Sequence, residues 1–253
     1  MRFISLTLSF LLAVVFTASA QANPERIGYI VNYGTHEWYQ NVIFGLQSRA
    51  DELGIQLDVM DANLDINKQT QQAEDFMTKG VDVLIMTPVN EEGVVPILRK
   101  AKAEGMPVVL EGSPAKGMTT LFAICDYDAG YKAGDEVGRI LVSRGVKEAR
   151  VMDVGLPMLS ATVLRSLGFM EAIAKHLPSV KVHDLDGSGM IDSSVEVASA
   201  ALAKDSNINV IYGINDGSAL GGLQAWRAAG LPEDKLVVAG TGAEGLAFLN
   251  EMT

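Results

Sequence analysis

Two adjacent aromatic residues, Trp38 and Tyr39, follow the first apolar segment of the chain, and His36 stands just before them. The apolar segment Arg26–Asn32 is typical of a buried strand, and the residues after it begin a helical pattern. In open α/β sheets, ligands bind beyond the carboxyl ends of the strands. Aromatic faces match the apolar C–H faces of a sugar ring, and a polar neighbour can bind its hydroxyls. We interpret the pair as a stacking platform for a ligand; the alternative is that it only covers the start of the helix.

The sequence motifs for cofactor binding and catalysis are incomplete or misplaced in this chain. Gly240, Gly242 and Gly245 have the spacing of a dinucleotide-binding loop, but they lie in the last strand–helix unit rather than the first. Gly112–Gly117 has the glycine spacing of a phosphate-binding loop, but Met118 stands where a lysine is needed. The three histidines and the single cysteine are dispersed. We therefore expect no cofactor, no metal site and no catalytic centre.

Short apolar segments alternate with amphipathic ones from Arg26 onward, which predicts strands and helices in turn. Strand–helix–strand units of this length form right-handed crossovers in a parallel sheet. A glycine follows each of the first three predicted helices, where a left-handed cap is needed. The predicted strands are Arg26–Asn32, Ile55–Met60, Val81–Met86, Pro107–Leu110, Leu121–Cys125, Ala149–Val154, Val180–Leu185, Val210–Gly213 and Leu236–Ala239. The predicted helices are Glu37–Leu53, Asn67–Lys79, Glu91–Glu104, Ala129–Arg144, Ala161–His176, Ile191–Lys204 and Ser218–Ala229.

The non-periodic stretch Gly112–Thr120 separates two blocks of this pattern. The predicted fold class is therefore α/β, with two Rossmann-like lobes whose parallel sheets are joined by a hinge. We place the N-terminal lobe at residues 23–122 and the C-terminal lobe at residues 123–253. The helical pattern that begins at Gly245 stops at Thr253 without a cap or a closing strand. We expect that the last crossover is missing and that the C-terminal lobe is incomplete.

The composition excludes several classes of protein. Hydrophobic residues make up 48% of the chain, which excludes a disordered polymer. The 20 basic and 31 acidic residues give a formal net charge of −11. Binding to nucleic acid requires a basic surface, so no nucleic acid partner is expected. An anionic membrane surface is an equally poor match for this charge.

The first 22 residues have the pattern of a secretory signal peptide. Arg2 precedes the apolar run Phe3–Thr17, and the small residues of Ala18–Ala22 form cleavage patterns. The apolar run is short for a membrane-spanning helix. We expect a cleaved signal peptide at residues 1–22, with an uncleaved anchor as the alternative. The single Cys125 excludes an intrachain disulfide.

Several segments resemble the ribose/galactose-type periplasmic binding proteins of bacterial ABC importers, whose fold is the type I periplasmic binding fold. The most specific segments are Arg165–Phe169 and Asn215–Gly221, while Gly80–Ile85 and Ala129–Gly134 stand at matching places. The resemblance covers Arg26–Asn250. It implies a monomeric, non-enzymatic binding protein in the periplasm. That protein would capture a small polar ligand, a sugar or a sugar-like polyol, and present it to an ABC permease in the inner membrane.

In the N-terminal lobe the resemblance implies four ligand-binding residues. Trp38 and Tyr39 match the family's stacking aromatics, and His36 matches their polar neighbour. Glu111, at the end of the fourth predicted strand, matches an acid that binds hydroxyls and is usually aspartate. A carboxylate can accept hydrogen bonds from adjacent hydroxyls of a polyol. The alternative for Glu111 is a solvated strand end.

In the C-terminal lobe the resemblance implies four more contacts. Cys125 or Asp126 lies at the crossing between the lobes, where a small polar contact is common. Arg165 matches an arginine whose planar guanidinium donates a fixed fork of hydrogen bonds to ligand oxygens. Asn215 matches an amide contact, and Thr241 stands where the family usually has aspartate. The alternatives are a surface ion pair for Arg165 and a helix cap for Asn215.

Other functions remain open from the sequence. A periplasmic sensor that presents its ligand to a histidine kinase or chemoreceptor would have the same fold and a similar cleft. The replacement of the usual aspartate by Thr241, together with His36, leaves open a modified sugar, a furanose or a small non-sugar ligand. A sugar-sensing repressor is disfavoured by the predicted signal peptide and by the acidic charge. An enzyme is distinguished by turnover of its ligand, and a chain that does not fold is distinguished by the lack of a cooperative melt.

Overall fold

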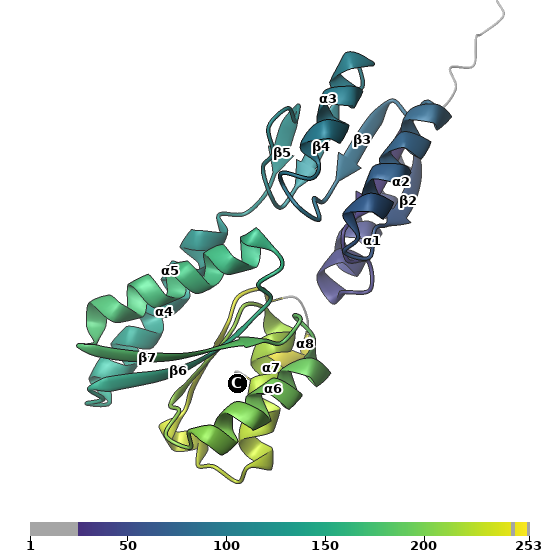
Figure 1. Ribbon diagram of the computed structural model, residues 1–253. Helices are drawn as coiled ribbons and strands as arrows, with labels where there is room; N and C mark the ends of the chain where they lie inside the picture. Colours follow the sequence, from purple (N-terminus) through teal and green to yellow (C-terminus); the bar gives the residue numbers. More distant parts are fainter. Residues whose placement is uncertain (1–24, 244–245, 252–253) are drawn as a thin grey trace, which may run out of the picture.

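The computed structural model describes residues 25–243 and 246–251, and these form two α/β lobes in succession along the chain (Figure 1). The signal peptide predicted at residues 1–22 lies outside the described residues. None of the helices within the described ranges is both long and apolar enough to cross a membrane. The two parallel-sheet lobes confirm the predicted fold class.

The N-terminal lobe is built on a parallel sheet with the strand order β2-β1-β3-β4-β5. Its strands are β1 (Arg26–Val31), β2 (Gln56–Asp61), β3 (Val83–Met86), β4 (Val108–Glu111) and β5 (Thr120–Phe122). Its helices are α1 (Glu37–Leu53), α2 (Ile66–Lys79) and α3 (Val95–Ala103). In this strand order β1 lies between β2 and β3, so the loops after β1 and β3 diverge and leave a crevice at the carboxyl end of the sheet.

The two faces of the N-terminal sheet are covered to different extents. Helices α2 and α3 cover one face, and Phe76, Leu84 and Leu98 are fully buried there. Helix α1 lies on the other face, and Ala50 is the only one of its residues that is buried. This helix supplies the residues after β1 that face the other lobe, so its first turn decides the geometry of the site.

The C-terminal lobe is built on a parallel sheet with the strand order β7-β6-β8-β9. Its strands are β6 (Glu148–Gly155), β7 (Ser179–Asp186), β8 (Val210–Gly213) and β9 (Val237–Gly240). Its helices are α4 (Asp126–Ser143), α5 (Ser160–His176), α6 (Ile191–Lys204), α7 (Asp216–Ala228), the short 3₁₀ helix η1 (Glu233–Lys235) and α8 (Leu246–Glu251). The chain enters this lobe through residues 123–125, directly after β5 (Figure 1).

Both faces of the C-terminal sheet are covered by a pair of helices. Successive residues of β6 point to opposite faces, so Val151 packs towards α4 and α5 while Met152 packs towards α6 and α7. Helices α4 and α5 approach closely because glycines of each helix face the backbone of the other. A Cβ atom on Gly130 would lie 1.9 Å from the carbonyl oxygen of Arg165, and one on Gly168 would lie 2.1 Å from that of Tyr127. This close packing fixes the helix that carries Arg165.

Several predicted elements are confirmed and some boundaries are wrong. Helix α1 has the predicted bounds, and Gly54 ends it in a left-handed conformation with φ 69°. The helix predicted from Glu91 begins only at Val95, because Pro96 occupies its first turn, where a missing N–H costs least. The crossing strand predicted at Leu121–Cys125 is shorter, since β5 ends at Phe122 and α4 begins at Asp126.

Candidate functional site

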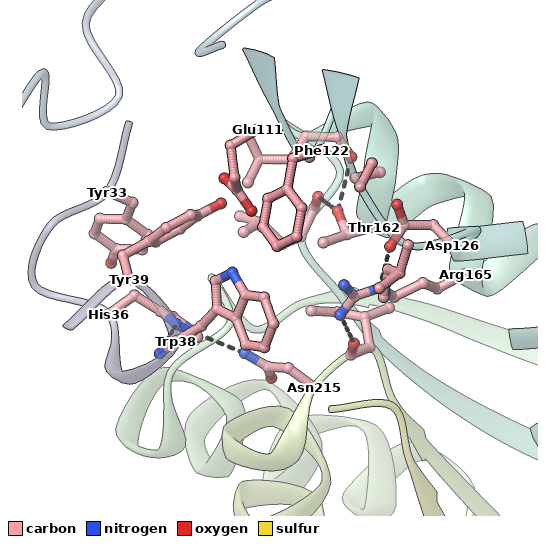
Figure 2. A pocket seen from close by; sticks show the side chains of 17 residues that line it. Tyr33, His36, Trp38, Tyr39, Glu111, Phe122, Asp126, Thr162, Arg165 and Asn215 are labelled. Atoms are coloured by element: carbon pink, nitrogen blue, oxygen red, sulfur yellow. Dashed lines mark hydrogen bonds and ion pairs between the residues drawn. The ribbon is translucent and has the colours of Figure 1, made fainter. Parts of the chain in front are cut away.

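A cavity lies between the two lobes and is lined by residues of both (Figure 2). Its volume is about 110 Å³. A single bound water needs only about 10–15 Å³ on this measure, so the cavity has room for a small molecule. Of the eight site residues predicted from the sequence, seven line the cavity and only Thr241 does not. These seven are His36, Trp38, Tyr39, Glu111, Asp126, Arg165 and Asn215.

Each lobe presents the carboxyl ends of its strands to the cavity. The N-terminal lobe contributes the start of α1, which follows β1, and the last residue of β4. The C-terminal lobe contributes the start of α5 after β6 and the residues after β8. In the C-terminal sheet β6 and β8 flank the point where the strand order reverses, which is where ligands bind in open α/β sheets.

The side chain of His36 is held in place by the backbone at the start of α1. It is the N-cap residue, with φ −76° and ψ 139°, and its Nδ1 accepts a hydrogen bond from the backbone N–H of Trp38 at 3.2 Å. Its Nε2 lies 3.3 Å from the carbonyl oxygen of Gly189 and 2.7 Å from Nδ2 of Asn215, both in the other lobe. His36 is only 8% exposed, and this burial lowers its pKa.

Aromatic side chains surround His36 and enter the cavity. The ring centroid of His36 lies 5.9 Å from that of Tyr33 and 6.0 Å from that of Tyr39. Figure 2 shows the rings of Trp38 and Phe122 pointing into the space that Arg165 reaches from the other lobe. These rings offer apolar faces on the N-terminal side of the cavity, which suit the C–H faces of a cyclic ligand.

Glu111 belongs to a buried chain of hydrogen bonds in the N-terminal lobe. The Thr87 hydroxyl donates to Oε2 of Glu111 at 2.8 Å, and the hydroxyl oxygen of Tyr29 lies 3.0 Å from that of Thr87. Burial raises the pKa of Glu111, while the bond from Thr87 and the neighbouring Trp38 side chain oppose that rise. Glu111 therefore lines the cavity as a buried carboxyl group beside Trp38.

Arg165 forms an ion pair with Asp126 that is largely removed from solvent. Nε of Arg165 donates to Oδ1 of Asp126 at 2.7 Å, and Nη1 donates to the carbonyl oxygen of Ile214 at 2.9 Å. Asp126 lies in the first turn of α4. The surface ion pair that was the alternative for Arg165 is thus replaced by a buried one. Because the charges of the two side chains cancel, this part of the cavity is electrically neutral.

Asn215 lines the cavity and also caps helix α7. Its Oδ1 accepts a hydrogen bond from the backbone N–H of Ser218 at 2.8 Å, and its Nδ2 donates to the carbonyl oxygen of Gly189 at 2.9 Å. The sequence left a ligand contact and a helix cap as alternatives. The structure confirms the cap, and because the same side chain lines the cavity, the ligand contact stays a prediction. Asp216, the first residue of α7, accepts a hydrogen bond through Oδ1 from the backbone N–H of Ala243 at 3.0 Å.

Thr241 lies beside the cavity rather than on its wall. Its hydroxyl oxygen is 2.7 Å from the hydroxyl oxygen of Tyr212, and its carbonyl oxygen is 3.4 Å from Nη1 of Arg165. The side chain of Thr241 therefore pairs with Tyr212, and only its backbone carbonyl contacts Arg165.

Ten of the 17 lining residues were not predicted from the sequence, and Tyr33, Phe122 and Thr162 are the aromatic and hydroxyl side chains among them. Tyr33 precedes the aromatic pair in the same loop, and its position after a strand was a usable signal. Thr162 stands one helical turn before Arg165, so helix spacing could have placed both on one face. Phe122 is the last residue of an edge strand, and nothing in the local pattern indicated which way it points.

Within residues 25–243 and 246–251, no group of three or more His, Cys, Asp or Glu side chains is arranged to hold a metal ion. The site is therefore described by its aromatic rings, the neutral Arg165–Asp126 pair, the buried Glu111 and the amide of Asn215. These groups can stack on a small ring and exchange hydrogen bonds with it.

Comparison with known proteins places these features in a family. A sequence model described as "Periplasmic binding protein domain" matches residues 27–252. The ribose import binding protein of Haemophilus influenzae is 30% identical over 231 residues, which cover 89% of this chain and 76% of that protein.

Two solved structures illustrate the similarity of fold. An ABC transporter solute binding protein from Bacillus halodurans with bound myo-inositol has a TM-score of 0.79 at 21% identity, covering 88% of this chain and 77% of that chain. The fructose binding periplasmic domain of a hybrid two component system has a TM-score of 0.77 at 25% identity, covering 90% of this chain and 77% of that chain. The family match spans both lobes and the cavity between them. The chain therefore belongs to the periplasmic binding protein family.

Proposed function

We propose that this protein is a periplasmic solute-binding protein that captures a small polar ligand, a sugar or sugar-like polyol, for an ABC importer. The observation that carries the proposal is the cavity between the lobes, which combines aromatic rings of one lobe with the Arg165–Asp126 pair of the other. Family membership, the 30% identity to a ribose import binding protein and the likeness to a structure with bound myo-inositol support this ligand class.

The charges around the cavity support a neutral ligand. Arg165 and Asp126 neutralise each other, and Glu111 adds an acidic group beside Trp38. A ligand with its own negative charge would meet Glu111 without a free cationic partner. Hydroxyl groups can donate to Glu111 and accept from Arg165, while Trp38 stacks on the ring.

Ligand binding would act by closing the lobes. A ligand shifts the population towards the closed state only by contacts that the open state lacks, so it must touch both lobes. Trp38 and Glu111 would supply the contacts of the N-terminal lobe, and Arg165 those of the C-terminal lobe. The closed form would then dock on the permease, and no covalent step is required.

A thermal melt of the protein against a panel of sugars, polyols and small osmolytes tests this proposal. A ligand at 100 times its Kd adds about 2.7 kcal/mol of stability. For a chain of this size the melting temperature should rise by roughly 5–10 °C. A selective rise that disappears in Trp38→Ala and persists in Phe44→Ala, on the exposed face of the same helix, would support the cavity as the site. A clean melt with no shift for any sugar or polyol would contradict the ligand class.

A sensor is the second candidate function. One of the similar structures is the fructose binding periplasmic domain of a hybrid two component system, at 25% identity over 90% of this chain. In that case the closed form would act on a histidine kinase or chemoreceptor instead of a permease. The neighbouring genes distinguish the two roles, since permease and ATPase genes are expected for an importer and kinase genes for a sensor.

A further inference from the structure

A polar contact joins the two lobes. Nε2 of His36, in the N-terminal lobe, lies 3.3 Å from the carbonyl oxygen of Gly189 and 2.7 Å from Nδ2 of Asn215, in the C-terminal lobe. We call these three residues the interlobe contact. A hydrogen bond from the Ser160 hydroxyl to Glu91 also crosses between the lobes. Figure 2 shows His36 and Asn215 facing each other at the edge of the cavity.

The interlobe contact is made by groups that the backbone holds in place. His36 is the N-cap of α1 and Asn215 is the N-cap of α7. Gly189 has φ 69° in the turn before α6, a conformation that favours glycine. A Cβ atom at Gly189 would lie 3.3 Å from Nδ2 of Asn215 and 3.6 Å from Nε2 of His36. The carbonyl oxygen of Gly189 thus reaches both side chains because its own residue is small and its turn is left-handed.

The protonation state of His36 determines which of its contacts can be hydrogen bonds. A neutral imidazole has one donor and one acceptor nitrogen. Nδ1 of His36 faces the backbone N–H of Trp38, and Nε2 faces an N–H of Asn215 as well as the acceptor oxygen of Gly189. Either neutral tautomer satisfies one of the two facing donors, and the tautomer protonated at Nε2 also donates to Gly189. The imidazolium ion has no acceptor nitrogen, so it would place N–H against N–H at both Trp38 and Asn215.

We propose that neutral His36 stabilises the closed arrangement, in which the two lobes touch through the interlobe contact, and that protonation of His36 favours their separation. When the lobes separate, the Nε2–H group can turn to water and lose its close approach to Asn215. The protein would then start its binding cycle from a mixture of open and closed forms whose ratio depends on pH.

The groups around His36 determine the direction of this pH dependence. Burial has the largest effect and lowers the pKa of His36 in the closed form. The bond to Gly189 and the charge of Glu37 oppose this effect, and the charge of Arg165 adds to it. The rings of Tyr33 and Tyr39 pack against the imidazole from the same lobe. Separation of the lobes would expose the ring and return its pKa towards the ordinary value of about 6.5. The closed form therefore binds fewer protons than the open form. Its stability relative to the open form is complete at pH values above the ordinary histidine pKa, and it is lost as the pH falls through the lowered pKa of His36.

Small-angle X-ray scattering of the ligand-free protein between about pH 8 and about pH 5 tests the proposal, since histidine titrates in this range. We expect the radius of gyration to rise on acidification, with unchanged far-ultraviolet circular dichroism. In His36→Asn the N-cap is retained, because asparagine is a preferred cap, but the side chain is too short for Gly189 and does not titrate. This variant should have the larger radius at both ends of the pH range.

His183→Asn is the matched control, because His183 lies on β7 and pairs with Asp205, away from the other lobe. It should keep the pH-dependent rise. A radius that does not change with pH in the wild type would overturn the proposal. A rise of equal size in His36→Asn would overturn it too, since Glu111 and Asp153, whose pKa values burial raises, would then account for the rise. The experiment contains no ligand, so its failure would leave the proposed binding function untouched.

Discussion

The two lobes have the same kind of sheet but bury it differently. In the C-terminal lobe the helix pairs α4/α5 and α6/α7 cover both faces, and Phe169 is fully buried against Tyr212. In the N-terminal lobe α2 and α3 cover one face, while α1 lies on the other with Phe44 75% exposed. The C-terminal lobe therefore supplies a rigid wall of the cavity, and the N-terminal lobe supplies aromatic residues from its least buried helix.

Replacing one phenylalanine in each lobe tests this comparison most strongly. Phe169 stacks on Tyr212 with ring centroids 3.9 Å apart and is 0% exposed, so Phe169→Ala should lower the free energy of unfolding by about 3–5 kcal/mol. Phe44→Ala should change it by less than about 0.5 kcal/mol. Denaturant titration measures both. Equal losses in the two variants would show that α1 is as well buried as α5.

Breaking the Arg165–Asp126 ion pair of the C-terminal lobe should give the next largest loss of stability. Arg165→Ala leaves the buried carboxylate of Asp126 without its partner, and removal of one member of a buried pair costs about 3–5 kcal/mol. Lys175→Ala, in an exposed pair on the same helix, should melt close to the wild type. A small loss in Arg165→Ala would mean that water reaches Asp126 freely.

Replacing a buried acid of the same lobe should stabilise the protein, whereas Arg165→Ala destabilises it. Burial raises the pKa of Asp153 to about 6, although the Ser166 hydroxyl donates to it at 3.0 Å. Because the pKa is raised on folding, stability is lost as the pH rises from the ordinary value to about 6. Asp153→Asn should therefore stabilise the protein at pH 7, by at most roughly 3 kcal/mol, and should be near neutral at about pH 4. Melting curves at the two pH values check this. A stabilisation that does not depend on pH would show that the raised pKa of Asp153 is not its cause.

Substitutions of one helical glycine in each lobe should give the smallest changes in stability. A Cβ atom at Gly130 of α4 would collide with the backbone of Arg165, so Gly130→Ala should destabilise by about 1–3 kcal/mol. A Cβ atom at Gly45 of α1 meets nothing within 4 Å, so Gly45→Ala should stabilise by about 0.5–1 kcal/mol. Chemical denaturation of both variants measures the difference. If both were stabilising, α4 and α5 would have to be more loosely packed than the structure shows.

The fold was largely predictable because its signals are local. Alternating apolar and amphipathic segments predicted the strands and helices, and Gly54 and Gly80 correctly predicted left-handed helix ends. The start of α3 was wrong because an amphipathic pattern extends over residues 91–94, while Pro96 sets the real first turn.

The site was less predictable because side-chain direction depends on packing across elements. Strand ends and loops indicated His36, Trp38 and Glu111. The sequence also offered a helix cap as the alternative for Asn215, but nothing local decided between the cap and a ligand contact. Thr241 could not be placed from the sequence, since its distance from the cavity depends on where Arg165 lies. Whether these residues bind a ligand remains a prediction.

The central claim is that one ligand contacts both lobes across this cavity. Isothermal titration with the ligand found in the thermal panel tests it directly, using Trp38→Ala in the N-terminal lobe and Arg165→Lys in the C-terminal lobe. The lysine keeps a positive charge beside Asp126 but loses the planar fork of donors. We predict that each variant weakens binding at least tenfold, which is about 1.4 kcal/mol. Unchanged affinity in either variant would contradict the claim, because the ligand would then be held by one lobe alone.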